Sequence, residues 1–267
     1  MTKLSRFHPQ DRAIIPSIVA VLCILGVSIL QLPQLHRFSS SSRIASQATL
    51  NKELRSEKLR LSLMQRIPTF GFDNLIADWT FLNFLQYFGD EQARQKTGYS
   101  LSPDYFEVII ARDPHFLAAY QFISPSTSLY AAAPERSVQL MAKGLKLISP
   151  TVPQKSYYIW RYKGIDELLF LGDASAAKNS FAMAAKWASY YSDEESQQVA
   201  AISRGTAEFL AHNPHSKSAQ VAAWAMVLNN QVDNQTREIA IARIKALGGD
   251  VVISAEGVMQ VKLPKED

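Results

Sequence analysis

The longest run of apolar residues in the chain lies near its N-terminus. No charged residue occurs from Ala13 to Leu35, and Ile, Val, Leu and Ala dominate this stretch. A helix of about 20 such residues crosses the hydrocarbon core of a bilayer. The pattern therefore predicts a transmembrane helix over residues 13–35. It is preceded by a basic tail, residues 1–12, which carries Lys3, Arg6 and Arg12.

A basic tail before an apolar run is also how a cleaved signal peptide begins. Here the run is longer than the usual signal segment, and the nearest pair of small residues, Ser46 and Ala48, lies far beyond it. We therefore expect an uncleaved single-pass anchor, with the lipid bilayer as the first partner. Basic residues flank both ends of the span and give little orientation signal. An anchor whose N-terminus stays inside places the rest of the chain on the extracytoplasmic (periplasmic or lumenal) side, which is the orientation we expect.

Residues 36–66 combine a serine-rich linker with a second apolar pattern. Within them, residues 43–65 have apolar residues at helical spacing, with basic and acidic residues between them. We expect an amphipathic stalk helix whose apolar stripe packs on the domain that follows. The alternative is a helix that binds lipid headgroups or a partner. The apolar positions are Leu50, Leu54 and Leu61, joined by Leu59 and Leu63.

Residues 67–249 repeat a pattern of helix, short break and helix. No alternation typical of parallel strands intervenes, so a βαβ fold is not expected. The C-terminal tail, residues 250–267, has alternating apolar residues around a glycine, which favours a short β-hairpin or, alternatively, an extended end. The chain is therefore predicted to be all-α apart from that hairpin. Helices are expected over residues 74–88, 102–112, 115–120, 134–149, 154–171, 174–190, 194–210, 216–229 and 236–247.

Three local expectations follow from side-chain chemistry. The aromatic-rich segment 74–88, with Asp73 as its cap, is apolar nearly all round and is expected to be buried, which would make Asp78 a buried, partnered carboxylate. Ser102 is expected to cap the next helix. The sequence Ser124-Pro125-Ser126 is expected to break a helix.

The region from Asn74 to Leu210 contains sequence patterns that recur. A tight Gly172-Asp173 turn is followed by Ala177, Phe181 and Ala184, and is preceded by Trp160 and Gly164. These residues resemble the turn, second helix and first helix of a tetratricopeptide repeat, with the first-helix pair one residue too early. Two partial copies are formed by Phe106 and Ile109 before Asp113-Pro114, and by Ser137, Met141 and Gly144. The alternative is an unrelated helical bundle.

The resemblance implies a right-handed stack of helix hairpins whose concave face binds a peptide or a partner protein. On the first helix of the clearest repeat, Tyr158, Arg161 and Tyr162 are then the candidate protein-binding residues. The alternative is that these aromatic residues belong to the core, since aromatics at helical spacing are often buried.

Composition and motifs give no sign of catalysis. The net charge is only +4, and the basic excess lies mostly before residue 70, so a nucleic-acid-binding face is not expected. Cys23, inside the apolar run, is the single cysteine, and His212 and His215 flank a helix break rather than forming a ligand set. We expect no metal, no cofactor, no small-molecule substrate and no enzymatic activity. An enzyme with an unrecognised site is a minor alternative.

An anchor joined to a repeat domain, without catalytic motifs, indicates a function in assembly. The first hypothesis is a membrane-tethered scaffold or assembly factor that recruits partner proteins to a membrane complex. The alternative is a constitutive structural subunit held in such a complex through its transmembrane helix, whose Cys23, Gly26 and Ser28 offer a small-residue side.

Overall fold

The chain divides into two compact units, Met1–Leu50 and Asn51–Asp267. The computed structural model describes residue 26 and residues 47–229, 234–253 and 259–264, nearly all of them in the second unit. The described residues do not include the basic tail, the predicted span over residues 13–35 or the linker up to residue 46, with the exception of Gly26, which is helical. Among the helices in the described ranges, none is long and apolar enough to cross a bilayer.

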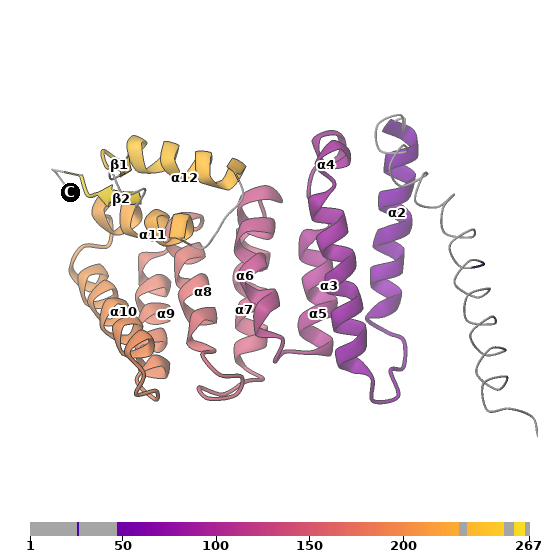
Figure 1. Cartoon of the computed structure of the whole chain (residues 1–267), viewed down its shortest axis with the longest axis horizontal. Helices are drawn as coiled ribbons and strands as arrows, with labels where there is room; N and C mark the ends of the chain where they lie inside the picture. Colours follow the sequence, from indigo (N-terminus) through magenta and orange to yellow (C-terminus); the bar gives the residue numbers. More distant parts are fainter. Residues whose placement is uncertain (1–25, 27–46, 230–233, 254–258, 265–267) are drawn as a thin grey trace, which may run out of the picture. The chain divides into compact units, whose positions relative to one another are not determined.

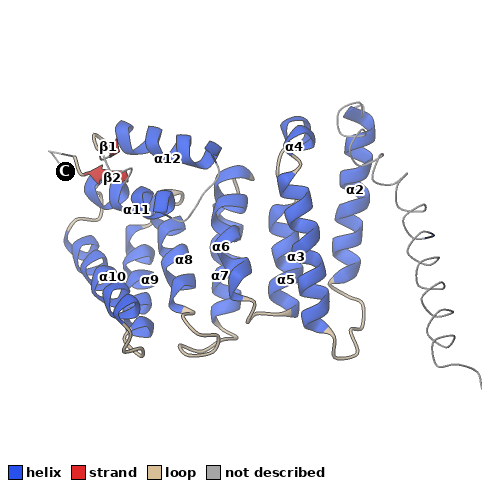
Figure 2. Ribbon diagram, in the orientation of Figure 1, coloured by secondary structure: helices blue, strands red, loops and turns tan. Residues whose placement is uncertain are grey.

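The second unit is mostly helical, which confirms the all-α class (Figures 1 and 2). From residue 102 onward, each helix packs against the next one in sequence, and a two-stranded hairpin ends the described chain. The elements are α2 (Gln47–Met64), α3 (Asp73–Gly89), α4 (Glu91–Thr97), α5 (Ser102–Arg112), α6 (Leu117–Ile123), the π-helix η1 (Ser124–Tyr130), α7 (Pro134–Leu145), α8 (Tyr157–Leu169), α9 (Ala174–Ala188), α10 (Glu194–His212), α11 (Lys217–Asn229), α12 (Asn234–Ala246), β1 (Asp250–Ile253) and β2 (Met259–Lys262).

The predicted stalk helix is α2, and its second half packs on the domain. Leu61 is fully buried in the main core and Leu54 is partly buried against it. The Glu57 carboxylate accepts a hydrogen bond from the Tyr105 hydroxyl at 2.6 Å. Leu59 and Leu63 were expected to belong to the same stripe, but they are exposed, because they point to the opposite side of the helix.

The structure of helix α3 corrects three predictions. It was expected to be buried all round, yet only one side, which includes Phe84, packs into the core, while Trp79 and other large apolar residues are exposed. Asp78 lies on the open side and is exposed rather than buried. The helix begins at Asp73, one residue earlier than expected, and the Asp73 carboxylate accepts a hydrogen bond from Arg112 at 3.0 Å instead of capping the helix. Neighbouring helices cover too little of α3 to bury its whole surface.

The break expected at residues 124–126 does not occur. Helix α6 continues directly into the π-helix η1, with Pro125 in its first turn, where a missing N–H is tolerated. The carboxylate of Asp166, fully buried on α8, accepts hydrogen bonds from the Ser124 hydroxyl and, each at 2.5 Å, from Ser128 and Ser137. These bonds connect η1, α7 and α8. Burial raises the pKa of Asp166 to about 6.

One further local prediction is corrected, and one helix was missed. Ser102 lies within the first turn of α5 rather than capping it, and its hydroxyl is buried without a partner. The short helix α4, capped by Asp90, was not predicted.

Glycines permit close packing at two helix contacts. On α8, a Cβ at Gly164 would lie 3.1 Å from the Phe181 ring of α9. On α7, a Cβ at Gly144 would overlap the ring and hydroxyl of Tyr120, which is fully buried and donates to the Pro114 carbonyl oxygen at 2.9 Å. Gly164 therefore lets α8 and α9 approach closely, and Gly144 does the same for α7 and α6.

A separate small core closes the C-terminal end of the described chain. Trp224 of α11 and Ile244 of α12 are buried there, and the Phe170 ring meets Trp224 edge-on at 5.7 Å. The strands β1 and β2 pair antiparallel, with Val251 opposite Val261, and both side chains pack against this core. The predicted hairpin is thus confirmed.

Candidate functional site

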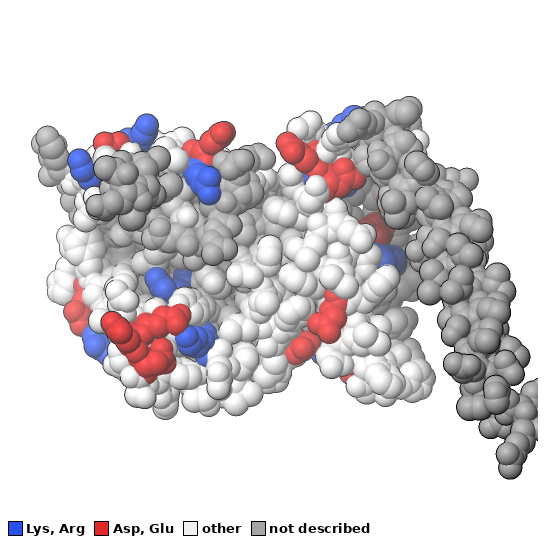
Figure 3. Space-filling view, in the orientation of Figure 1, with Lys and Arg blue, Asp and Glu red and all other residues white. Residues whose placement is uncertain are grey.

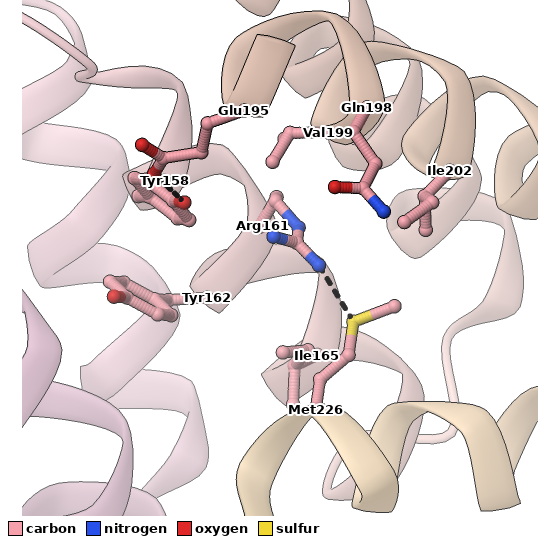
Figure 4. Close-up of a pocket in the computed structure, with 9 residues that line it drawn as sticks. All are labelled: Tyr158, Arg161, Tyr162, Ile165, Glu195, Gln198, Val199, Ile202 and Met226. Carbon is pink, nitrogen blue, oxygen red and sulfur yellow. Dashed lines mark hydrogen bonds between the residues drawn. The ribbon is translucent and has the colours of Figure 1, made fainter. Parts of the chain in front are cut away.

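Helices α8, α10 and α11 enclose a pocket of about 420 Å³ (Figure 4). The three candidate residues, Tyr158, Arg161 and Tyr162, all lie on the α8 side of it. We call it the tyrosine–arginine pocket, and its remaining lining residues are Ile165, Glu195, Gln198, Val199, Ile202 and Met226.

Two stacked tyrosines form one wall. Tyr158 and Tyr162 are one helical turn apart, with ring centroids 6.2 Å apart and planes at 23°. Both rings are half-buried, and burial raises the pKa of each hydroxyl, so both tyrosines stay neutral at physiological pH. The wall thus offers flat apolar surface with polar edges, the type of surface that is enriched in protein interfaces.

The acidic group at the rim already has partners. The Glu195 carboxylate accepts a hydrogen bond from the Tyr158 hydroxyl at 2.7 Å and forms an ion pair with Lys155. The hydrogen bond from Lys155 lowers the pKa of Glu195, which therefore stays charged. This arrangement fixes the Tyr158 ring and offsets the negative charge at the edge of the pocket.

Arg161 lies between the tyrosine wall and the rim, and it has few hydrogen-bond partners. Its Nε is buried and has no hydrogen-bond partner, and its Nη2 donates only to the Met226 sulfur at 3.3 Å (Figure 4). The guanidinium carbon is 5.7 Å from the Tyr158 ring centroid, a distant cation–π contact. None of the ion pairs between described residues includes Arg161, and burial lowers its pKa.

Sequence reasoning found the α8 side of the pocket and missed the other two sides. Gln198 and Ile202 follow Glu195 along one face of α10, and Met226 comes from α11. At the acidic start of α10, the Asp193 carboxylate caps the helix by accepting a hydrogen bond from the Ser196 nitrogen at 3.0 Å, and the helix dipole favours a negative charge there. Glu195 has a different partner, Lys155, which lies 40 residues earlier. No local signal in the sequence indicates that contact.

The surroundings differ in charge along the domain. In the view of Figure 3, the surface over α6 and α7 carries no charged side chains, whereas basic and acidic groups gather over α8 to α10.

A second pocket of about 370 Å³ lies between Gln65, α5 and α7. Its Arg136 is already paired with Asp104 at 2.7 Å and with Glu107. The Arg136 guanidinium therefore has carboxylate partners within the domain, unlike that of Arg161.

The described residues contain no group of three or more His, Cys, Asp or Glu side chains arranged to hold a metal ion. Comparison with protein-family models, with curated proteins and with solved structures finds no match to this chain. The tyrosine–arginine pocket therefore has to be interpreted from its own geometry.

Proposed function

We propose that the chain is a membrane-tethered scaffold or assembly factor, whose helical domain binds a segment of a partner protein in the tyrosine–arginine pocket. The observation that carries the proposal is the pocket itself, where two stacked tyrosines and a guanidinium without a carboxylate partner line one side. Tyrosine and arginine, together with tryptophan, are enriched at the energetic centres of interfaces.

The helical arrangement fits the same proposal. Consecutive helices in contact, close approach at Gly164 and Phe181, and the capped turn at Asp173 support a tetratricopeptide-like array. In such an array, each hairpin packs on its neighbours, so that side chains of successive helices line a shared surface. The pocket takes its residues from α8, α10 and α11 in this way.

The tether is proposed from the sequence. The charge-free segment over residues 13–35 is long enough to span a bilayer. Joining a binding domain to a membrane raises the local concentration of its partner near other membrane components. A scaffold gains from this arrangement even when the pocket binds its partner weakly.

Site-specific photocrosslinking in native membranes tests the proposal. A photoreactive residue at Ile202, which is 45 % exposed and lines the pocket, should give a discrete crosslinked product. The same residue at Gln95, exposed on α4, is the matched control and should not give that product. Absence of a product at position 202, or the same product at both positions, would contradict partner binding in this pocket.

One observation favours the alternative of a permanent structural subunit. Leu75, Trp79 and Leu82 of α3 are 53–60 % exposed and form a continuous stripe with Phe72, which is 62 % exposed. An exposed apolar stripe of this kind is typical of a protein–protein contact. A subunit should give a crosslink from Leu82 as well, and the complex should stay intact when the pocket is altered. A scaffold should lose its partner instead.

A further inference from the structure

The guanidinium of Arg161 is the charged group in the pocket that its own fold leaves without an oxygen acceptor. Its Nε is buried without a partner and its Nη2 reaches only a thioether. Taking a charge out of water without an acceptor is unfavourable, so such a group normally has a carboxylate or carbonyl nearby.

Other arginines of the same domain have such acceptors. Arg112 donates to the Asp73 carboxylate at 3.0 Å and to two backbone carbonyls. Arg136 is paired with two carboxylates. Arg94 stacks on the Tyr87 ring at 3.9 Å and donates to a carbonyl oxygen at 3.2 Å, although its Nε is also buried without a partner. Arg161 differs from these three in that it faces a pocket instead of an acceptor.

The charges around the pocket favour one negative charge in it. The titratable groups facing Arg161 are the neutral hydroxyls of Tyr158 and Tyr162 and the carboxylate of Glu195, which is paired with Lys155. Arg161, Lys155 and Glu195 together carry a net charge of +1. A single carboxylate would neutralise this site, whereas a doubly charged phosphate would leave an excess negative charge beside Glu195.

The pocket also provides a second donor and an apolar wall. In Figure 4 the amide of Gln198 extends from α10 towards the space beside Arg161. An arginine fork and an amide can together bind the two oxygens of a carboxylate. Val199 and Ile202 lie on the same helix and offer apolar contact for a neighbouring side chain. A volume of about 420 Å³ accommodates an acidic side chain together with part of such a neighbour.

Resting on the proposed function, we propose that the tyrosine–arginine pocket selects partner segments that present a carboxylate beside an apolar residue, with Arg161 and Gln198 as its donors. Arg161 then gives specificity for an acid, and the stacked tyrosines give apolar contact area. The acid enters a site where its counter-charge is already desolvated, so its replacement by a neutral amide weakens binding strongly.

Peptide selection on the full-length protein in nanodiscs tests this proposal. Short random peptides displayed on phage are selected on the wild type, on Arg161→Met and on Arg204→Met, which removes an exposed arginine of α10 as the matched control. We expect the wild type and Arg204→Met to enrich Asp or Glu beside apolar residues, and Arg161→Met to lose the acid while keeping the apolar preference. Enrichment without any acid, or an unchanged acid preference in Arg161→Met, would overturn the proposal but leave partner binding intact.

The enriched peptide is then synthesised with Glu, Gln or phosphoserine at the selected position, and with a free or amidated C-terminus. We expect the Glu-to-Gln change to weaken binding to wild type about tenfold or more, and to have little effect on Arg161→Met. The two C-termini show whether a side chain or the chain end supplies the carboxylate. Tighter binding of phosphoserine than of Glu would overturn the assignment. If the wild type enriches no peptide at all, the proposed function fails together with this inference.

Discussion

Arg161→Met is expected to leave the folded state at least as stable as the wild type, although it removes the charge proposed to bind the partner. The substitution eliminates a buried Nε without a partner and keeps an unbranched side chain in the pocket. An unsatisfied buried donor costs about 1–3 kcal/mol. The interactions lost are a 3.3 Å contact with a thioether and a distant cation–π contact, which is worth about 0.5–1 kcal/mol.

The net expectation is a gain of about 0–2 kcal/mol in the free energy of unfolding, taken from these two terms. For a domain of this size, each kcal/mol corresponds to a rise of about 2–4 °C in Tm. Equilibrium urea unfolding of the full chain, followed by helical circular dichroism in one detergent, measures the difference.

Two arginine variants calibrate the result. Arg204→Met on the exposed side of α10 should change the free energy by less than about 0.5 kcal/mol. Arg112→Met should lower it by more than about 1 kcal/mol, since it breaks one ion pair and removes the guanidinium donors of the Met64 and Ile67 backbone carbonyls. A loss of more than about 1 kcal/mol for Arg161→Met would place Arg161 among the structural arginines and refute the reasoning.

Three further sets of substitutions test packing and burial. Gly144→Ala should destabilise the domain by about 1–3 kcal/mol, because the added Cβ overlaps a buried tyrosine. Gly205→Ala, in open space on α10, should stabilise the domain by up to about 1 kcal/mol, and urea unfolding compares the two variants. Leu61→Ala should cost about 2–4 kcal/mol and Leu59→Ala less than about 0.5 kcal/mol in the same assay, because only the first side chain is buried. Burial raises the pKa of Asp166 above its unfolded value, so the contribution of Asp166 to stability is lost as the pH rises from about 4 to about 6. The difference in the free energy of unfolding between wild type and Asp166→Asn should fall by up to about 3 kcal/mol over that range. A difference that does not change with pH would contradict a buried, titrating carboxylate.

Periodicity and turn residues were sufficient to predict most helices. The segments after Gly172 and Ser216 and the final hairpin lie within a few residues of their expected bounds, since capping residues and glycines act locally. The errors arose where tertiary context decides. An apolar helix such as α3 contains no information about how much neighbouring surface exists to cover it, so the exposure of Trp79 and Asp78 could not be inferred. Likewise, Ser124, which was expected to help break α6, instead donates to a carboxylate 42 residues later in the chain.

The candidate site was predictable only in part. Tyr158, Arg161 and Tyr162 fall at positions i, i+3 and i+4, so their placement on one face of α8 follows from helical geometry. The sequence does not indicate that Arg161 lacks an acceptor, because a helix start with three acidic residues occurs about 30 residues later. Only the packing of α10 directs Glu195 to Lys155 and Tyr158 and leaves the guanidinium without a carboxylate.

The hairpin of β1 and β2 affects how this architecture could change in evolution. Arrays of helix pairs commonly lengthen by duplication, since each unit offers its successor a matching apolar surface. Here, Val251 and Val261 of the hairpin occupy such a surface beside α11 and α12. An extra helix pair added after α12 would therefore have to displace the hairpin. Duplication is easier before α11, because it would lengthen the proposed helical array without displacing the hairpin.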